Sequence, residues 1–341
     1  MNDRFLRACW REPVDSTPVW FMRQAGRSSP AYRAIRAKHG ILEIAKSPAL
    51  AAEVTLQPIH ELGVDAAILF ADLLLPLEAM GVRVRIDAGE GPVIEPPIRT
   101  PEDLDQLKPL DPKRDLPFVF ETIRRARSHA AVPCIGFAGA PFTMASYLIE
   151  GGASKDFTAT KSFLHNHPDE WRALMNLLAS GTAAYLRAQA EAGAQALQVF
   201  DSWAGALSPG DYDASVAPFT RRLFDEIREA GVPSIHFGTG TAGFLESFAS
   251  AGGDVVGIDW RIPIDAAWRR IGEHQAIQGN LDPAALLGTP EAWRPAAGDV
   301  LQRIGNRPGH VFNLGHGVLP QTPQDELRAL VRLVHETTRR T

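Results

Sequence analysis

Cysteine is scarce in this sequence, with Cys9 and Cys134 as its two examples in 341 residues. Two thiols so far apart along the chain do not make a disulfide framework, nor do they make a cysteine-rich metal site. A chain without structural disulfides is typical of a reducing compartment. We therefore expect the protein to work in the cytoplasm, which is the simplest such compartment.

A basic excess is also missing. The 35 lysines and arginines are outnumbered by 40 aspartates and glutamates, which gives a formal net charge of −5. A broad nucleic-acid surface needs a positive excess, so we expect no nucleic-acid partner. An anionic small molecule is still a suitable substrate, because one pocket can be positive in an acidic protein.

Long apolar runs are missing as well. The longest, residues 64–80, is interrupted by Asp65, Asp72, Pro76 and Glu78, and is too short and too charged to span a bilayer. The first residues lack the apolar core of a signal peptide, so we expect no membrane association. Sequence motifs for zinc, calcium or phosphate binding are absent, and we expect no metal site.

The chain does contain eight short apolar runs rich in Val, Ile and Phe. Most do not alternate with polar residues, which is typical of parallel strands that are buried on both faces. Amphipathic helical patterns, such as 171–192, 214–230 and 323–338, lie between them. Strand and helix alternating eight times predict an α/β protein with a (β/α)8 barrel. The predicted strands are Pro18–Met22, Asp65–Phe70, Val132–Ala138, Ala194–Phe200, Val232–Phe237, Val255–Trp260, Gln275–Leu281 and His310–Leu314.

Two stretches depart from this alternation. Residues 82–98 alternate apolar and polar side chains around Asp87–Gly91, which predicts a β-hairpin inserted after the second strand. The connection after the first strand is long, with helical patterns at 31–39 and 48–62. Neither stretch resembles a linker, so we expect residues 1–341 to form one domain. The structural alternative is an open doubly wound sheet, but its Gly-x-Gly-x-x-Gly turn is missing.

The active site of a (β/α)8 barrel lies where the strands end, so residues that follow each strand are the candidates. Arg23 and Arg27 follow the first strand, and their spacing of four residues predicts that they share one helix face. Their guanidinium groups suit a carboxylate ligand, whereas the plainer interpretation is a solvated or salt-bridged pair. Asp72 follows the second strand in an apolar segment and is either functional, paired with an arginine, or capping a loop.

Three further polar side chains follow later strands. Tyr147 lies in a helical stretch after the third strand, where it either faces the barrel mouth or packs on the helix. Ser202 is either a ligand contact or a helix N-cap, and it lacks the Gly-x-Ser-x-Gly setting of a nucleophile. His316 lies between two glycines and either meets a ligand or bonds its own loop. These residues indicate an enzyme for an anionic substrate without naming the reaction.

Longer motifs carry a resemblance to a known family. Residues 20–27, which read Trp-Phe-Met-Arg-Gln-Ala-Gly-Arg, closely resemble the N-terminal signature of uroporphyrinogen decarboxylases. Residues 136–143, with Tyr147 and residues 150–152 after them, resemble the second signature of the same family. The similarity covers essentially the whole chain. Further matches, in the expected order, are Phe70–Asp72, Phe200–Ser202, Gln278–Pro283 and Asn313–Gly317.

This resemblance implies a cofactor-free enzyme, usually a homodimer, that converts the four acetates of uroporphyrinogen III to methyl groups in haem biosynthesis. Loss of CO2 leaves a carbanion that needs an electron sink, and a protonated pyrrole ring replaces the usual cofactor. Asp72 would accept hydrogen bonds from the pyrrole N–H groups and balance the cationic ring. The proton donor is left open between an arginine, which is a poor acid, and a bound water. Besides Asp72, the residues implied in catalysis are Arg23 and Arg27, and those implied in substrate binding are Arg23, Gln24, Arg27, Tyr147, Phe200, Ser202 and His316.

The sequence departs from the family pattern at two places. Ser28–Arg33 replaces an aromatic-Leu-Pro-Glu-Tyr-Arg pattern, and Trp203 stands where some members have His. Two alternative functions also deserve comparison. A related barrel methyltransferase would need a zinc-binding His-x-Cys motif, but residues 236–238 here read His-Phe-Gly. A non-catalytic tetrapyrrole carrier would need the pocket but not Asp72.

Overall fold

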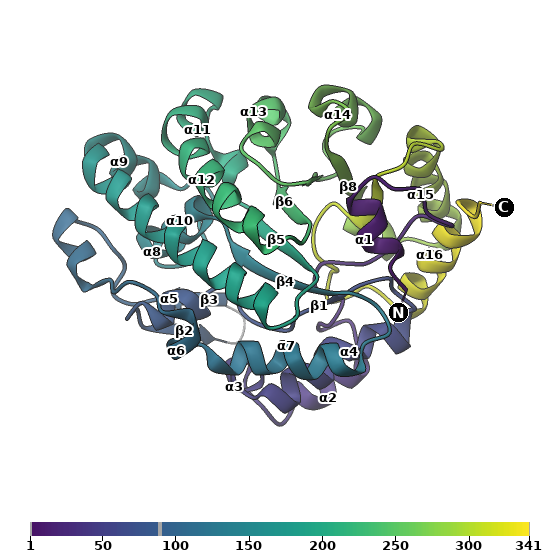
Figure 1. Ribbon diagram of the computed structural model, residues 1–341, viewed down its shortest axis with the longest axis horizontal. Helices are drawn as coiled ribbons and strands as arrows, with labels where there is room; N and C mark the ends of the chain where they lie inside the picture. The colour runs from purple at the N-terminus through teal and green to yellow at the C-terminus, as the bar shows by residue number, and fades with distance from the viewer. Residues whose placement is uncertain (1, 88–90, 341) are drawn as a thin grey trace.

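Seven parallel strands form the centre of the computed structural model, which describes residues 2–87 and 91–340. Their order is β1-β4-β5-β6-β7-β8-β9, so each strand lies beside the next one along the chain. Helices connect these strands and surround them (Figure 1). The strands are β1 (Ala67–Ile68), β4 (Cys134–Gly139), β5 (Ala196–Asp201), β6 (Ser234–Gly238), β7 (Val255–Gly257), β8 (Ala276–Leu281) and β9 (His310–Leu314).

The segment around Val19 closes this sheet into a barrel. Val19 forms a parallel bridge with Phe312 of β9, and the Phe312 N–H donates to the Pro18 carbonyl at 2.9 Å. On the other side, the Asp65 N–H donates to the Val19 carbonyl at 2.8 Å, just before β1. The segment therefore lies between the two edge strands, and the predicted (β/α)8 barrel is confirmed.

The first predicted strand, Pro18–Met22, is shorter than expected and amounts to one bridge. The Trp20 N–H donates to the Phe312 carbonyl of β9 at 3.4 Å, whereas side chains take the N–H groups of Val19, Phe21 and Met22. The Val19 N–H donates to the Asp65 carboxylate at 2.8 Å, and the Phe21 N–H donates to Gln24 Oε1 at 3.0 Å. A regular ladder cannot extend where its donors are already used.

Polar side chains bond one another inside the barrel. Trp20 Nε1 donates to Gln278 Oε1 at 3.0 Å, and Gln278 Nε2 donates to Gln198 Oε1 at 3.1 Å. Gln198 lies on β5 and points inward, so Phe200, two residues later, faces the same side. Asp201 faces the surrounding helices. This alternation decides which residues of a strand end reach the barrel mouth.

The helices cover the outside of the barrel (Figure 1). The predicted helices at 171–192 and 323–338 correspond to α10 and α16, whereas 214–230 is divided, with Pro218 in the first turn of α12. In the described part of the chain, no helix is long and apolar enough to cross a bilayer. The helices are α1 (Arg4–Cys9), α2 (Pro30–Arg36), α3 (Ile41–Lys46), α4 (Pro48–Leu62), α5 (Leu75–Ala79), α6 (Pro112–Asp115), α7 (Pro117–His129), α8 (Pro141–Glu150), α9 (Thr158–Asn166), α10 (Pro168–Glu191), α11 (Pro209–Ser215), α12 (Ala217–Ile227), α13 (Leu245–Ser250), α14 (Ile264–Ile271), α15 (Pro290–Ile304) and α16 (Gln324–Thr337), with 3-10 turns η1 (Pro101–Gln106), η2 (Ala204–Ala206), η3 (Arg228–Ala230), η4 (Thr241–Phe244) and η5 (Pro283–Leu287).

The predicted hairpin insertion is present after the second strand of the barrel. β2 (Val84–Asp87) pairs antiparallel with β3 (Gly91–Ile94), and its turn at residues 88–90 lies outside the described residues. The Ile94 N–H donates to the Gly151 carbonyl at 2.8 Å, just beyond the end of α8. The hairpin therefore braces the helix that carries Tyr147.

Candidate active site

Arg23 and Arg27 lie on an irregular turn after the Val19 bridge. Residues 22–28 form turns and bends, and Arg23 has φ +61°, so the predicted shared helix face was wrong. A residue in the left-handed region cannot continue a right-handed helix. The Arg23 side chain lies against Gly317, where an added Cβ would come within 2.5 Å of Arg23 Cδ. Both arginines are exposed, and among the described residues neither forms an ion pair with an acidic side chain.

Gln24 has a buried side chain that is bonded to the backbone. Its side chain is buried, Oε1 accepts from the Phe21 N–H at 3.0 Å, and Nε2 donates to the Ala66 carbonyl at 3.0 Å. Both ends of the amide are therefore used by the backbone. Gln24 ties the arginine turn to the start of β1 and so helps to hold Arg23 in place.

Asp72 lies between β1 and α5 and is half-buried. One carboxylate oxygen accepts from the Leu74 N–H at 2.9 Å, which is the loop-capping bond that the sequence left open. Within residues 2–87 and 91–340, no cationic side chain forms an ion pair with Asp72. Burial raises the pKa of Asp72, opposed by the Leu74 N–H and the positive charge of Arg23. The second oxygen is therefore available for a ligand that donates hydrogen bonds.

Tyr147 lies on α8 and packs against Trp203, with ring centroids 4.1 Å apart. Burial raises the pKa of Tyr147 to about 12, with a further upward contribution from the negative charge of Asp72 and an opposing one from Arg23. Asp72 and Arg23 therefore lie within electrostatic reach of the Tyr147 hydroxyl group. The phenol stays protonated at neutral pH and can donate a hydrogen bond to an anionic ligand.

His316 is half-buried in the loop after β9. Its Nδ1 accepts from the Gly317 N–H at 2.7 Å, so the predicted loop bond is present. Burial lowers the pKa of His316 to about 4, and the positive charges of Arg23 and Arg261 lower it further. The imidazole is neutral at pH 7, and its Nε2 can act as a donor. Asp72, Tyr147 and His316 all lie within electrostatic reach of Arg23.

Phe200 and Ser202 complete the candidate site from the end of β5. Phe200 contacts Phe137 and Phe237 edge to face, with centroid distances of 5.6 and 5.9 Å, and Phe237 contacts His316 at 6.2 Å. This row of rings forms an apolar floor beside the polar side chains. Ser202 is half-buried and does not cap η2, whose N-cap residue is Trp203.

Sequence reasoning missed a buried pair behind Ser202. Asp201 and His236 are both fully buried, and Asp201 Oδ2 lies 3.7 Å from His236 Nε2. Asp201 Oδ1 accepts from Thr143 Oγ1 at 3.2 Å, which joins α8 to β5. The signal was the alternation along β5, which turns Asp201 away from the mouth while Phe200 and Ser202 approach it.

The lowered pKa of His316 predicts a pH-dependent stability. Between its ordinary pKa of 6.5 and its folded pKa of about 4, the unfolded chain binds a proton that the folded chain does not. From pH 7 to pH 5, His316 should therefore lower the free energy of unfolding by about 1–2 kcal/mol. Urea unfolding at both pH values should show a smaller loss for His316→Gln than for wild type or for the exposed control His165→Gln. Equal losses in all three proteins would contradict a neutral, buried His316.

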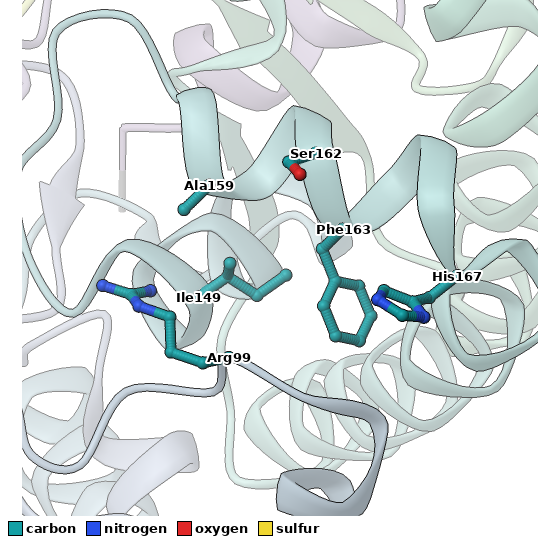
Figure 2. Close-up of a pocket in the computed structure, with 6 residues that line it drawn as sticks. All are labelled: Arg99, Ile149, Ala159, Ser162, Phe163 and His167. Carbon is teal, nitrogen blue, oxygen red and sulfur yellow. The ribbon is translucent and has the colours of Figure 1, made fainter.

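A cavity of about 150 Å³ lies away from these residues. Figure 2 shows it beside helices α8 and α9, with Arg99, which precedes η1, on one side and Phe163 and His167 on the other. None of the predicted site residues lines it. The candidate site is instead the open end of the barrel, where the loops after the strands meet.

Comparison with known proteins decides the family. The sequence matches the family profile described as uroporphyrinogen decarboxylase (URO-D) over residues 1–337. The chain belongs to the uroporphyrinogen decarboxylase family. It is 54% identical over 338 residues to the uroporphyrinogen decarboxylase of Solibacter usitatus, with 98% of each chain covered. It is 52% identical over 338 residues to the enzyme of that name from Carboxydothermus hydrogenoformans, covering 98% of this chain and 97% of the relative.

A solved structure with a different name shares the fold of this family member. It is a methyltransferase from Methanosarcina mazei, with a TM-score of 0.83, 21% sequence identity and 98% of both chains covered. At this identity the likeness concerns the fold alone. In the described residues, no group of three or more His, Cys, Asp or Glu side chains is placed to hold a metal ion. His236, the candidate for the zinc motif, is fully buried and stacks on Phe248 at 3.7 Å.

Proposed function

We propose that this chain removes the carboxyl groups of the four acetate side chains of uroporphyrinogen III, which yields coproporphyrinogen III and CO2. The observation that carries this proposal is the position of Asp72. It is a half-buried carboxylate without an ion-pair partner among the described residues, and it lies within the electrostatic reach of Arg23 and Tyr147. A negative side chain in that setting suits a ligand that becomes cationic during the reaction.

The reaction needs an electron sink, which the substrate itself can provide. A proton adds to a pyrrole ring carbon, and the ring becomes a cation. The bond between the acetate methylene and its carboxyl group then breaks, CO2 leaves, and the electron pair moves into the ring. The methylene carbon takes up a proton and the ring carbon releases its own. Each cycle therefore consumes one proton, and Asp72 stabilises the cationic stage by accepting hydrogen bonds from pyrrole N–H groups.

The remaining side chains would bind the periphery of the macrocycle. Arg23 and Arg27 offer exposed guanidinium groups for carboxylates, and Tyr147 and His316 offer neutral donors. Ser202 would add a hydroxyl contact, and Phe200 would pack against the ring system. Gln24 would act by positioning the arginine turn, since its amide is already bonded to the backbone. A water held by the arginines would be a better proton donor than a guanidinium group, which is too weak an acid.

The direct test is anaerobic incubation of the purified protein with uroporphyrinogen III, followed by chromatography of the oxidised products. The expected result is a series with seven, six, five and four carboxyl groups. Binding of the substrate without any loss of carboxyl groups would contradict the proposal and favour a carrier. Transfer of a methyl group to a thiol would favour the methyltransferase alternative.

Arg27→Ala should mainly weaken substrate binding. A charge-assisted hydrogen bond to a carboxylate contributes about 1.5–3 kcal/mol, so we expect KM to rise about 10- to 100-fold. Steady-state kinetics should show this rise, while Arg172→Ala serves as the control. Arg172 is an exposed arginine on α10 that pairs with Asp169, and it follows none of the barrel strands directly. An unchanged KM in Arg27→Ala would count against a carboxylate contact.

We further propose that the chain acts as a homodimer in the cytoplasm. The homodimer is supported by what the family resemblance implies, and the compartment by the two thiols. Cys9 and Cys134 are buried and unpaired, and burial raises the pKa of each, which keeps them protonated. Sedimentation velocity should give twice the mass of one chain, whereas a single-chain mass would contradict the dimer.

A further inference from the structure

A third arginine lies at the barrel mouth, in the loop that follows β7. Arg261 forms an ion pair with Asp259, and the Arg261 N–H also donates to Asp259 at 3.0 Å. The Asp259 carboxylate is 3% exposed and accepts from the Gly240 N–H at 2.7 Å. The buried aspartate therefore holds Arg261 at two places, its backbone N–H and one end of its guanidinium group.

Two further contacts hold this loop in one arrangement. Asn280 Nδ2 donates to the carbonyls of Asp259 and Ile262, each at 2.8 Å, and so brackets the two residues between them. The Arg261 guanidinium lies over the Trp260 ring, 4.3 Å from its centroid. The side chain is therefore held before any ligand arrives, which lowers the entropy cost of binding.

The anchored guanidinium still has donors to offer. Arg261 is 52% exposed, and in the described residues only its Nη1 bonds to Asp259. A guanidinium carries five N–H donors in a planar fork that matches a carboxylate. The ion pair with Asp259 therefore leaves most of the guanidinium N–H donors available to a ligand.

The loop of Arg261 touches the loop of His316. An added Cβ at Gly315 would lie 2.6 Å from the Trp260 nitrogen, so the backbones of the two loops are in direct contact. His316 follows Gly315, and Arg261 follows Trp260. The positive charge of Arg261 also lowers the pKa of His316, so the two side chains lie within electrostatic reach of each other.

We propose that Arg261 binds a peripheral carboxylate of the tetrapyrrole, on the side of the macrocycle that faces β7. This rests on the proposed function. Asp72 follows β1, and β7 is the fourth strand after β1 around the closed barrel. Arg261 therefore lies across the mouth from Asp72, and it adds a second cation on the side where Arg23 lies against Gly317. A macrocycle with carboxylates on every side needs such a cation there.

The test compares Arg261→Gln, Arg261→Lys and a control, Arg269→Gln, with uroporphyrinogen III as the substrate. Arg269 is an exposed arginine on α14 that also pairs with an aspartate, Asp265. We expect Arg261→Gln to raise KM about 10-fold or more, with a smaller fall in kcat, since a charge-assisted hydrogen bond is lost. Arg261→Lys keeps the charge without the fork, so its KM should lie between those of wild type and Arg261→Gln. Arg269→Gln should match wild type.

The outcomes separate the two proposals. A wild-type protein that does not decarboxylate uroporphyrinogen contradicts the proposed function. An active wild type with an unchanged KM in Arg261→Gln overturns the role of Arg261. Thermal unfolding of all variants addresses a purely structural role, because loss of the anchor alone would lower Tm and leave KM unchanged. Should Arg261→Gln fail to fold, the KM of Arg261→Lys decides, and a value equal to wild type overturns the proposal.

Discussion

Replacing Asp72 with asparagine is expected to lower turnover of uroporphyrinogen about 10²- to 10³-fold, which is typical for the loss of one preorganised electrostatic group. The fold should be kept, because an asparagine oxygen can still accept from the Leu74 N–H, now at 2.9 Å from Asp72 Oδ1. What disappears is the negative charge opposite the cationic ring. Its loss should raise the energy of the protonated substrate, whereas the carboxylate contacts proposed for Arg23 and Arg27 should be kept.

The measurement is kcat under anaerobic conditions, with circular dichroism to check the fold. Asp105→Asn is the matched control, since Asp105 is an exposed aspartate in η1. The control should turn over like wild type. An Asp72→Asn protein that is as fast as wild type would remove the basis of the proposed mechanism, and an unfolded variant would show in the spectrum.

The pH dependence of kcat and kcat/KM tests the role of Asp72 in a second way. Burial raises the pKa of Asp72, so the free enzyme should lose activity as the pH falls through a value above that of an ordinary aspartate. Pyrrole N–H donors favour the charged carboxylate, so the acid limb of kcat should lie at lower pH than that of kcat/KM. Asp72→Asn should lack this limb in its residual rate.

The barrel was predictable because its strands are buried on both faces. Runs such as Val132–Ala138 and His310–Leu314 are apolar without alternation, and the described strands β4 and β9 overlap them. The length of the first strand was harder to predict, because a side chain distant in sequence accepts one of its backbone hydrogen bonds. The Asp65 carboxylate takes the Val19 N–H, and no local pattern announces that bond. The extent of a strand depends on such tertiary partners, whereas its existence depends on burial.

The candidate site was predictable for those residues that were chosen because they follow a strand. Asp72, Tyr147 and His316 follow different strands, yet the positive charge of Arg23 acts on all three. The arginine turn was mispredicted because a spacing of four residues matches a helix, while Arg23 is left-handed. The partners of the Gln24 amide were not predictable for a related reason, since they are backbone groups before and after it in the sequence. Spacing identifies which residues are near one another, but it does not give their orientation.

Asp65→Ala is expected to lower the free energy of unfolding by about 3–5 kcal/mol, the usual cost of breaking a buried charged network. Asp65 is 2% exposed and lies just before β1, at the opposite end of that strand from Asp72. Its carboxylate accepts from the Val19 N–H at 2.8 Å, from Arg4 Nη1 at 2.8 Å and from His335 Nε2 at 2.7 Å. One side chain therefore joins the closing segment, the N-terminal helix α1 and the C-terminal helix α16.

Removal of this carboxylate leaves the buried Val19 N–H without a partner, which has a desolvation cost, and takes from Arg4 its buried partner while the exposed Asp15 remains. Urea unfolding should show the loss, with Asp299→Ala as the control. Asp299 is 55% exposed and pairs with Arg303 one helical turn away, so its removal should cost less than about 1 kcal/mol. Equal losses in the two variants would contradict a network centred on Asp65. Because the Val19 bridge precedes the arginine turn, a folded Asp65→Ala protein should also bind uroporphyrinogen more weakly, with a higher KM than that of the control.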